Sequence, residues 1–531
     1  MAQPILLSDD EISRFITDGY LILDCGLPET LHARIYERLQ WVFGKEGNPG
    51  NNILPAVPEF QQVLDSPRIQ GALMSILGSD YILHPHRFVH NNEPGKRTEE
   101  GELIGKGSQT FIGWHQDDHS PLSRPRHHYP RYAMILYYPQ DTFDHVGPTQ
   151  LIPATHLHRS ISDTDKPRTL KGSGRAGTCV LVHFDTVHGG SLNLADYSRY
   201  MAKFVFMRAS NPQAPSWDNQ APEWHTPNGH QSPVESPVVW SQIWNWMRGV
   251  QVNRNPTPRA IHTVESLVQT LEESTSLEAR VSAINALATL GNSADAAIPT
   301  LLNALSGEEY LRQNALYALA AIGEPAILPL IERLKACSEN RWTESANAME
   351  NESYALSAIG ASAVPALIGL LSHENEWVQI NALFALGEIG KPARSAFWDV
   401  CAKLRSPAHP VVRTALDALG QIGGEEEDVL PELRRLFTES NPDWQSWMYR
   451  TWTGENQVRV NAMTALLRLG YDSEEAIQTA ALALNDPCGY VGGFGVEYLL
   501  RRDSLTALRA AAAFLKAHRW DDSLRKGVRT F

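Results

Sequence analysis

The sequence predicts a protein of two domains, a β-rich domain with flanking helices followed by an all-helical solenoid. The chain has 531 residues, which is too long for one hydrophobic core. Short β-rich runs separated by glycine, proline and asparagine turns fill its first half, and a helical pattern repeats in its second half. The predicted domains cover residues 1–255 and 262–531. The polar stretch 251–260, which contains two prolines, is the predicted linker.

The first domain begins with helical signals and continues with strand signals. Ser8 is followed three residues later by Glu11, a capping-box pattern at the start of a helix. Residues 29–43 have helical spacing, so a second helix is expected to flank the sheet. The predicted strands cover residues 19–23, 131–138, 177–184 and 199–208.

An alanine-rich helix that ends at glycine recurs through the second domain. Glycine takes the left-handed conformation after a helix at little cost. No single unit can bury its apolar face alone, so the units are expected to stack into a solenoid. Residues 262–490 resemble short HEAT-like repeats. The helix-ending glycines are Gly291, Gly323, Gly360, Gly390, Gly423 and, in a degenerate copy, Gly470. Prolines expected in the first turn of the next helix are Pro299, Pro329, Pro365 and Pro431.

The solenoid has two interpretations. It is either a surface for a protein partner or self-association, or an appendage that stabilises the chain. The insertions 337–349 and 441–457 contain Trp and Tyr, which are enriched at interfaces but could equally be buried beneath their own loops.

Composition argues against several classes of function. The formal net charge of −14 does not favour nucleic-acid binding. The five cysteines show no CxxC pairing, so a reducing, cytoplasmic location is expected. The N-terminus lacks a basic start followed by an apolar run, and no stretch of 18 apolar residues occurs. We therefore expect neither a nucleic-acid nor a membrane partner.

The stretch "GWHQDDHSP", residues 113–121, raises the question of a metal site. His115 and Asp117 supply two ligands, and a mononuclear Fe(II) site of the two-histidine, one-carboxylate type needs one more histidine. His188, near the end of a predicted strand, offers it. The pair His183 and Asp185 also fits the His-x-Asp pattern. Choosing it would leave the His115 segment without a role.

Arg199 follows His188 by eleven residues and begins the next predicted strand. If the two strands pair, its guanidinium points into the same cavity and can clamp the distal carboxylate of 2-oxoglutarate. Lys203 is expected to lie about 13 Å further along the strand, too far to replace it.

Four ordered motifs carry a family resemblance over residues 5–210. They are "WHQDD", "GPTQLIPATH", "HGGSLNLADYSR" and the strand between the first two. Together they resemble the phytanoyl-CoA dioxygenase family. The resemblance implies a double-stranded β-helix, or jelly roll, with Fe(II), 2-oxoglutarate and O₂. It also implies that His115, Asp117 and His188 are the catalytic metal ligands and that Arg199 anchors 2-oxoglutarate.

One position departs from the family pattern. Members often carry a hydroxyl two residues after the distal histidine, where this chain has Gly190. Thr149 and Ser191 are the alternative hydroxyls. Because Asp117 retains the carboxylate that related halogenases lack, the resemblance implies hydroxylation of a small molecule with release of succinate and CO₂. The competing hypothesis is a catalytically idle jelly roll on a protein-binding solenoid.

Three further features are interpreted less specifically. Asp118 and His119 are expected at the rim of the metal site. The polar tract 95–110 is a candidate mobile loop. Trp240 and Trp244, spaced i, i+4, predict a helix that packs on the β-rich domain or acts as a lid.

Overall fold

The computed structural model describes most of the chain and divides it into two compact units. The first unit contains Met1–Ser120, Tyr129–Ser232 and Ala513–Phe531, and the second contains Pro121–His128 and Pro233–Ala512. The predicted linker and domain boundaries at 255 and 262 lie outside the described residues, so they stay a prediction. The described ranges are 3–97, 103–104, 113–117, 125–250, 263–337, 339–343, 347–445 and 452–517.

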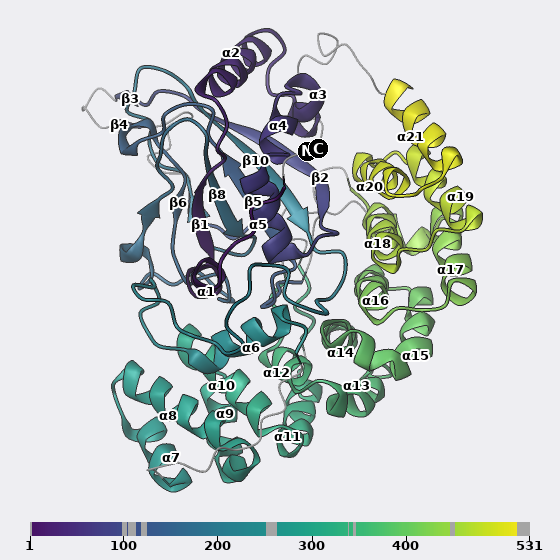
Figure 1. Cartoon of the computed structure of the whole chain (residues 1–531). Coiled ribbons are helices and arrows are strands. Elements are labelled where there is room, and N and C mark those ends of the chain that lie inside the picture. Colours follow the sequence, from purple (N-terminus) through teal and green to yellow (C-terminus); the bar gives the residue numbers. More distant parts are fainter. Residues whose placement is uncertain are drawn as a thin grey trace. The chain divides into compact units, whose positions relative to one another are not determined.

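A five-stranded antiparallel sheet forms the centre of the first unit (Figure 1). Four of its strands coincide with the four predicted ones. The fifth was not predicted, because Pro85 and several histidines interrupt its apolar pattern. In spatial order the strands are β1 (Tyr20–Asp24), β8 (Thr178–His183), β5 (Tyr132–Tyr137), β10 (Arg199–Met207) and β2 (Ile82–Asn92).

Shorter strands complete the β-rich unit. One sheet joins β7 (Leu170–Lys171), β6 (Gln150–Leu151) and β9 (His188–Gly189), and another joins β3 (Lys96–Arg97) and β4 (Leu103–Ile104). The β-rich fold is as predicted. The closed jelly roll is not confirmed, because the described strands form separate open sheets.

Helices flank the central sheet as the sequence predicts. The capping box of α1 (Asp9–Asp18) is formed, because the Ser8 hydroxyl accepts from the Glu11 N–H and the Glu11 carboxylate accepts from the Ser8 N–H. The second predicted helix is α2 (Glu29–Lys45). Helix α5 (Pro67–Leu77) lies against β1, β5 and β10. The remaining helices here are α3 (Ile53–Ala56) and α4 (Phe60–Leu64).

The second unit stacks helices in sequence order, as Figure 1 shows in the colours from teal to yellow. Each long helix packs on the long helix of the next repeat. The helices are α6 (Pro237–Met247), α7 (Val264–Glu273), α8 (Leu277–Leu290), α9 (Ile298–Ala304), α10 (Glu309–Ile322), α11 (Glu324–Lys335), α12 (Asn351–Ile359), α13 (Val364–Leu370), α14 (Glu376–Ile389), α15 (Phe397–Ala402), α16 (His409–Ile422), α17 (Glu426–Thr438), α18 (Gly454–Leu469), α19 (Glu474–Leu482), α20 (Gly489–Leu500) and α21 (Leu505–Ala517).

The predicted helix ends are confirmed. All six glycines stand at the end of a long helix with φ between 56° and 88°. Pro299 and Pro365 lie in a first turn, as expected. Pro329 and Pro431 instead lie inside α11 and α17, because both helices begin earlier in the sequence than the prolines suggested.

Buried asparagines join successive repeats. Asn314 and Asn381 are fully buried and Asn285 is nearly so. The Asn285 amide donates to the Asn314 side chain at 3.0 Å, and Asn381 Oδ1 accepts from the Glu350 N–H at 2.8 Å. Because a buried amide needs partners, these bonds fix how neighbouring repeats stack.

Residues 125–128 pack on the helical unit, which the sequence did not predict. The Arg126 N–H donates to the Asn347 carbonyl at 2.8 Å, and the Tyr354 hydroxyl donates to the Arg126 carbonyl at 2.8 Å. The His128 ring stacks on Tyr354 with ring centroids 3.9 Å apart. This short stretch therefore belongs structurally with the repeats.

Several predicted aromatic surfaces are buried. Trp240 and Trp244 of α6 are buried in the second unit, where α6 contacts α8 and α10. Packing of this helix on the β-rich domain and its role as a lid stay predictions. Trp444 and Trp452 are also buried. Trp342 is half-buried beside Arg413.

Some sequence expectations concern residues without a description. Asp118, His119 and most of the tract 95–110 lie outside the described residues. In the part that is described, no single helix is long and apolar enough to cross a membrane. One bent pair, Asn351–Ile359 with Ala361–Leu370, meets the length and composition criteria only jointly.

Candidate metal centre

His115 and His188 lie opposite each other in a short antiparallel pairing. The His115 N–H donates to the His188 carbonyl at 3.0 Å, and the His188 N–H donates to the His115 carbonyl at 2.9 Å. Asp117 follows two residues later, so its side chain is on the same face as that of His115. The ligand atoms of these three residues lie within 4.8 Å of one another, and no other group in the described ranges meets this criterion for a metal ion.

Both imidazoles are oriented by backbone carbonyls. His115 Nδ1 lies 3.0 Å from the Gly113 carbonyl, and His188 Nδ1 lies 2.9 Å from the Thr186 carbonyl. Because a carbonyl can only accept, each Nδ1 carries the proton and each Nε2 is free to bind a metal. Burial lowers the pKa of His188 to about 4, although Asp117 opposes this shift. The His188 ring is therefore neutral near pH 7, as metal binding requires.

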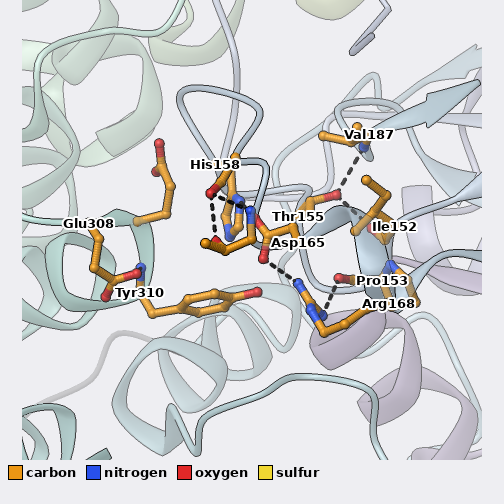
Figure 2. A network of polar contacts seen from close by, with 12 residues as sticks. Ile152, Pro153, Thr155, His158, Asp165, Arg168, Val187, Glu308 and Tyr310 are labelled. Carbon is orange, nitrogen blue, oxygen red and sulfur yellow. Dashed lines mark hydrogen bonds and ion pairs between the residues drawn. The ribbon is translucent and has the colours of Figure 1, made fainter. Parts of the chain in front are cut away.

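A polar network supports the chain leading to His188 (Figure 2). The Val187 N–H donates to the Thr155 hydroxyl at 3.0 Å. Arg168 donates to the Pro153 carbonyl at 3.0 Å from the adjoining segment. The "GPTQLIPATH" motif thus braces the residue directly before a metal ligand.

The competing pair, His183 and Asp185, has a different position. The Asp185 N–H donates to His183 Nδ1 at 3.3 Å, within the turn that leads from β8 toward His188. The side chain of Gln116 donates to the Asp185 carbonyl at 2.9 Å. The pair therefore supports the two metal-binding segments and is not part of the group of three.

Arg199 is held beside this group by Gly147. Its Nε and Nη2 donate to the Gly147 carbonyl at 3.0 and 2.8 Å. Gly147 has φ 73°, and a Cβ there would lie 2.8 Å from the backbone nitrogen of Asn193, so a larger residue would be strained at this position. Arg199 Nη1 is buried and, among the described residues, has no hydrogen-bond partner. A buried donor without a partner fits a carboxylate ligand.

The two alternative hydroxyls are in different situations. The Ser191 hydroxyl donates to the Pro148 carbonyl. Thr149 lines the cavity, and its N–H donates to the Tyr138 hydroxyl at 3.0 Å. Thr149 is therefore the better placed to offer a hydroxyl to a bound ligand.

One cavity of about 600 Å³ contains the metal group, Arg199 and Thr149. Its wall also includes residues of β2, β5 and β10. His90 and Asn92 of β2 belong to this wall, and the sequence did not single them out. Their strand was unpredicted, so no pattern placed them near the site.

Two protein families match different parts of this chain. Residues 6–201 match the phytanoyl-CoA dioxygenase family. Residues 264–350 and 364–451 of the same chain match the HEAT repeat family. Both families and their order are as predicted from the sequence. The search of curated proteins found no match.

Solved structures of similar proteins align with part of this chain. The non-heme alpha-ketoglutarate-dependent carbocyclase SnoK from nogalamycin biosynthesis is 19% identical, with 39% of this chain and 88% of SnoK covered and a TM-score of 0.30. EctD from S. alaskensis, solved with 2-oxoglutarate and 5-hydroxyectoine, is 15% identical, with 44% and 87% covered and a TM-score of 0.32. The non-heme monooxygenase ThoJ with nickel is 16% identical, with 41% and 89% covered and a TM-score of 0.30.

Lys203 lies close to the proposed metal ligands, whereas the sequence predicted that it lies away from them. Its Nζ lies 3.0 Å from Asp117 Oδ2 and 3.2 Å from Oδ1. The prediction assumed that the metal ligands face the start of β10, near Arg199. Asp117 instead faces Lys203, in the middle of the strand. Burial alone would raise the pKa of Asp117, but the charges of Lys203 and the two histidines lower it far below its ordinary value. Asp117 is therefore ionised.

Proposed function

We propose that the first unit is an Fe(II)- and 2-oxoglutarate-dependent dioxygenase that hydroxylates a small molecule and releases succinate and CO₂. One observation carries this proposal. His115, Asp117 and His188 line the same cavity as Arg199, whose buried Nη1 has no hydrogen-bond partner among the described residues.

The three side chains fit a non-haem iron ion. Two neutral imidazole nitrogens and one carboxylate oxygen are the ligand set that such sites use, and it leaves coordination positions open. Lys203 donates to both oxygens of Asp117 and stabilises this buried carboxylate in the metal-free protein. When bound, iron with 2-oxoglutarate and O₂ supplies the oxidant, and the protein supplies binding and orientation.

Arg199 and Thr149 would bind 2-oxoglutarate. The Gly147 carbonyl accepts from Nε and Nη2 of Arg199, which leaves the buried Nη1 without a partner among the described residues. A carboxylate there would form a charge-assisted hydrogen bond. Thr149 lines the same cavity, and its hydroxyl is a donor that such a ligand could use.

The dimensions of the cavity support a small substrate. A volume of about 600 Å³ falls within the range of ligand pockets, roughly 300–1,000 Å³. 2-Oxoglutarate occupies only part of this space. The same proposal includes the closed jelly roll that the family resemblance implies. It also includes a cytoplasmic location, and a protein partner or self-association through the HEAT repeats.

Two measurements test the proposed reaction. Anaerobic addition of Fe(II) and 2-oxoglutarate to the full-length protein should produce the weak visible band of the iron–2-oxoglutarate complex. After O₂ is admitted with ascorbate present, succinate should accumulate slowly even without substrate, since uncoupled turnover needs only these components. Metal binding without any succinate would favour the catalytically idle alternative.

A further inference from the structure

Strand β10 presents two buried cations to the cavity. Arg199 and Lys203 are four residues apart, so they lie on the same face of the strand, with Met201 between them. All three line the cavity, and the two cations are only 3% and 5% exposed. Arg199 has a role in the proposed function, as the anchor of 2-oxoglutarate. Lys203 has none beyond its contact with Asp117.

The immediate neighbours of Lys203 across the sheet are apolar. Lys203 pairs with Phe88 on β2 and with Leu136 on β5. Residues directly opposite on antiparallel strands point to the same face, and both neighbours line the cavity as Lys203 does. A lysine ammonium is therefore held against an apolar wall, where an unpaired charge is costly.

Asp117 is the anion that compensates Lys203 in this structure, at 3.0 and 3.2 Å. In the proposed function this carboxylate also binds a divalent cation. The Asp117 carboxylate then neutralises part of the charge of the metal, and the Lys203 ammonium has a second positive charge close to it. A further anion beside Lys203 would neutralise this excess positive charge.

Among the described residues that line the cavity, the other carboxylate is Glu93, and it is too far along the strand to serve. Glu93 follows the end of β2, where Asn92 pairs with Arg199. Its backbone is five residues from Phe88, the partner of Lys203, or about 17 Å along an extended chain. Glu93 therefore lies at the Arg199 end of the cavity.

We propose that Lys203 anchors an acidic group of the substrate, and that the substrate is a small carboxylic acid with an apolar body. The acid would pair with the ammonium, and the apolar body would contact Phe88, Leu136 and Met201. This inference rests on the proposed function, because it assumes that Asp117 binds the metal and Arg199 binds 2-oxoglutarate.

The test uses full-length protein loaded with Ni(II), which binds without turnover, and with saturating 2-oxoglutarate. Binding of both is measured first by calorimetry, and failure at this stage would count against the proposed function itself. The probes are cyclohexanecarboxylate and its uncharged counterpart, cyclohexanecarboxamide. Their dissociation constants are measured by ligand-observed NMR, which also shows whether 2-oxoglutarate stays bound.

The acid should bind about tenfold or more tightly than the amide, because a charge-assisted hydrogen bond is replaced by a neutral one. Lys203→Met should remove this preference while Ni(II) binds no more weakly, and Lys203→Arg should retain it. Lys171→Met is the matched control, since Lys171 lies on β7 with its ion pair to Asp144 outside the cavity, and it should leave both affinities unchanged.

Several results would overturn the inference. The acid and the amide could bind equally, neither could bind, or the acid could displace 2-oxoglutarate. Loss of Ni(II) binding together with the acid preference in Lys203→Met would show that Lys203 only positions Asp117.

Discussion

Lys203 and Asp117 form a buried ion pair between strand β10 and residues 113–117, with Nζ 3.0 Å from Oδ2. Their side chains are 7% and 2% exposed. This pair connects the proposed metal ligand to the same strand that carries the proposed 2-oxoglutarate anchor. The site therefore depends on a contact between residues far apart in sequence.

Replacing Lys203 by Met should destabilise the metal-free protein. The substitution leaves the Asp117 carboxylate buried without its cation, which costs about 3–5 kcal/mol in comparable cases. Thermal unfolding followed by calorimetry measures the loss. Adding Ni(II) should recover much of it, because the metal supplies the missing positive charge. An unchanged melting temperature in the metal-free variant would show that the pair is not formed in solution.

Acid should weaken the metal-free protein through His188. Its pKa is about 4 in the folded state because of burial, below the ordinary value of 6.5. The unfolded chain therefore binds more protons than the folded one between these values, and the free energy of unfolding falls as the pH decreases from about 6.5 to about 4. Denaturant unfolding across this range measures the slope. His188→Asn should make the free energy of unfolding less dependent on pH. An identical pH dependence in both proteins would show that the pKa of His188 is not lowered in the folded state.

Arg199→Ala should weaken 2-oxoglutarate binding far more than metal binding. It removes the cation with the unpartnered Nη1, and the loss of one partner of a buried charged contact costs about 2–5 kcal/mol, or about 30-fold to several-thousand-fold in affinity. Calorimetry with Ni(II)-loaded protein measures both affinities. Arg175→Ala, at an exposed arginine, is the control. Equal 2-oxoglutarate affinity in wild type and Arg199→Ala would remove the main support for the cosubstrate.

Asn381→Ala should destabilise the helical unit. It removes the acceptor of the buried Glu350 N–H and of the Ser353 hydroxyl, and an unsatisfied buried donor costs about 1–3 kcal/mol. Chemical unfolding followed by circular dichroism measures the change. Asn303→Ala, at an exposed position on α9, should have a much smaller effect. Similar losses in both variants would show that the buried amides do not hold the repeats together.

Short sequence patterns predicted most strands of the central sheet and the ends of the repeated helices. Apolar β-rich runs identified the four central strands, and glycine identified the ends of the repeated helices because it takes the left-handed conformation at low cost. Strand β2 was missed because Pro85 and its histidines conceal an ordinary strand pattern.

Features that depend on tertiary contacts were less accessible. The family resemblance implied that His115, Asp117 and His188 lie together, and their ligand atoms lie within 4.8 Å of one another. The predicted position of Lys203 was wrong because its distance from Arg199 along β10 does not show which of the two residues faces Asp117. The docking of residues 125–128 on Tyr354 joins segments more than 200 residues apart, and no local pattern indicates it.

Anaerobic titration of two aspartate variants with Fe(II) tests whether Asp117 is a metal ligand. Asp117→Ala should lose most of its affinity for Fe(II), because it leaves two ligands where three are needed. Asp185→Ala should bind Fe(II) nearly as well as wild type, since Gln116 of the metal segment donates to the backbone carbonyl of Asp185, which the substitution retains. Full Fe(II) binding by Asp117→Ala together with its loss in Asp185→Ala would show that Asp185, and not Asp117, is the metal ligand.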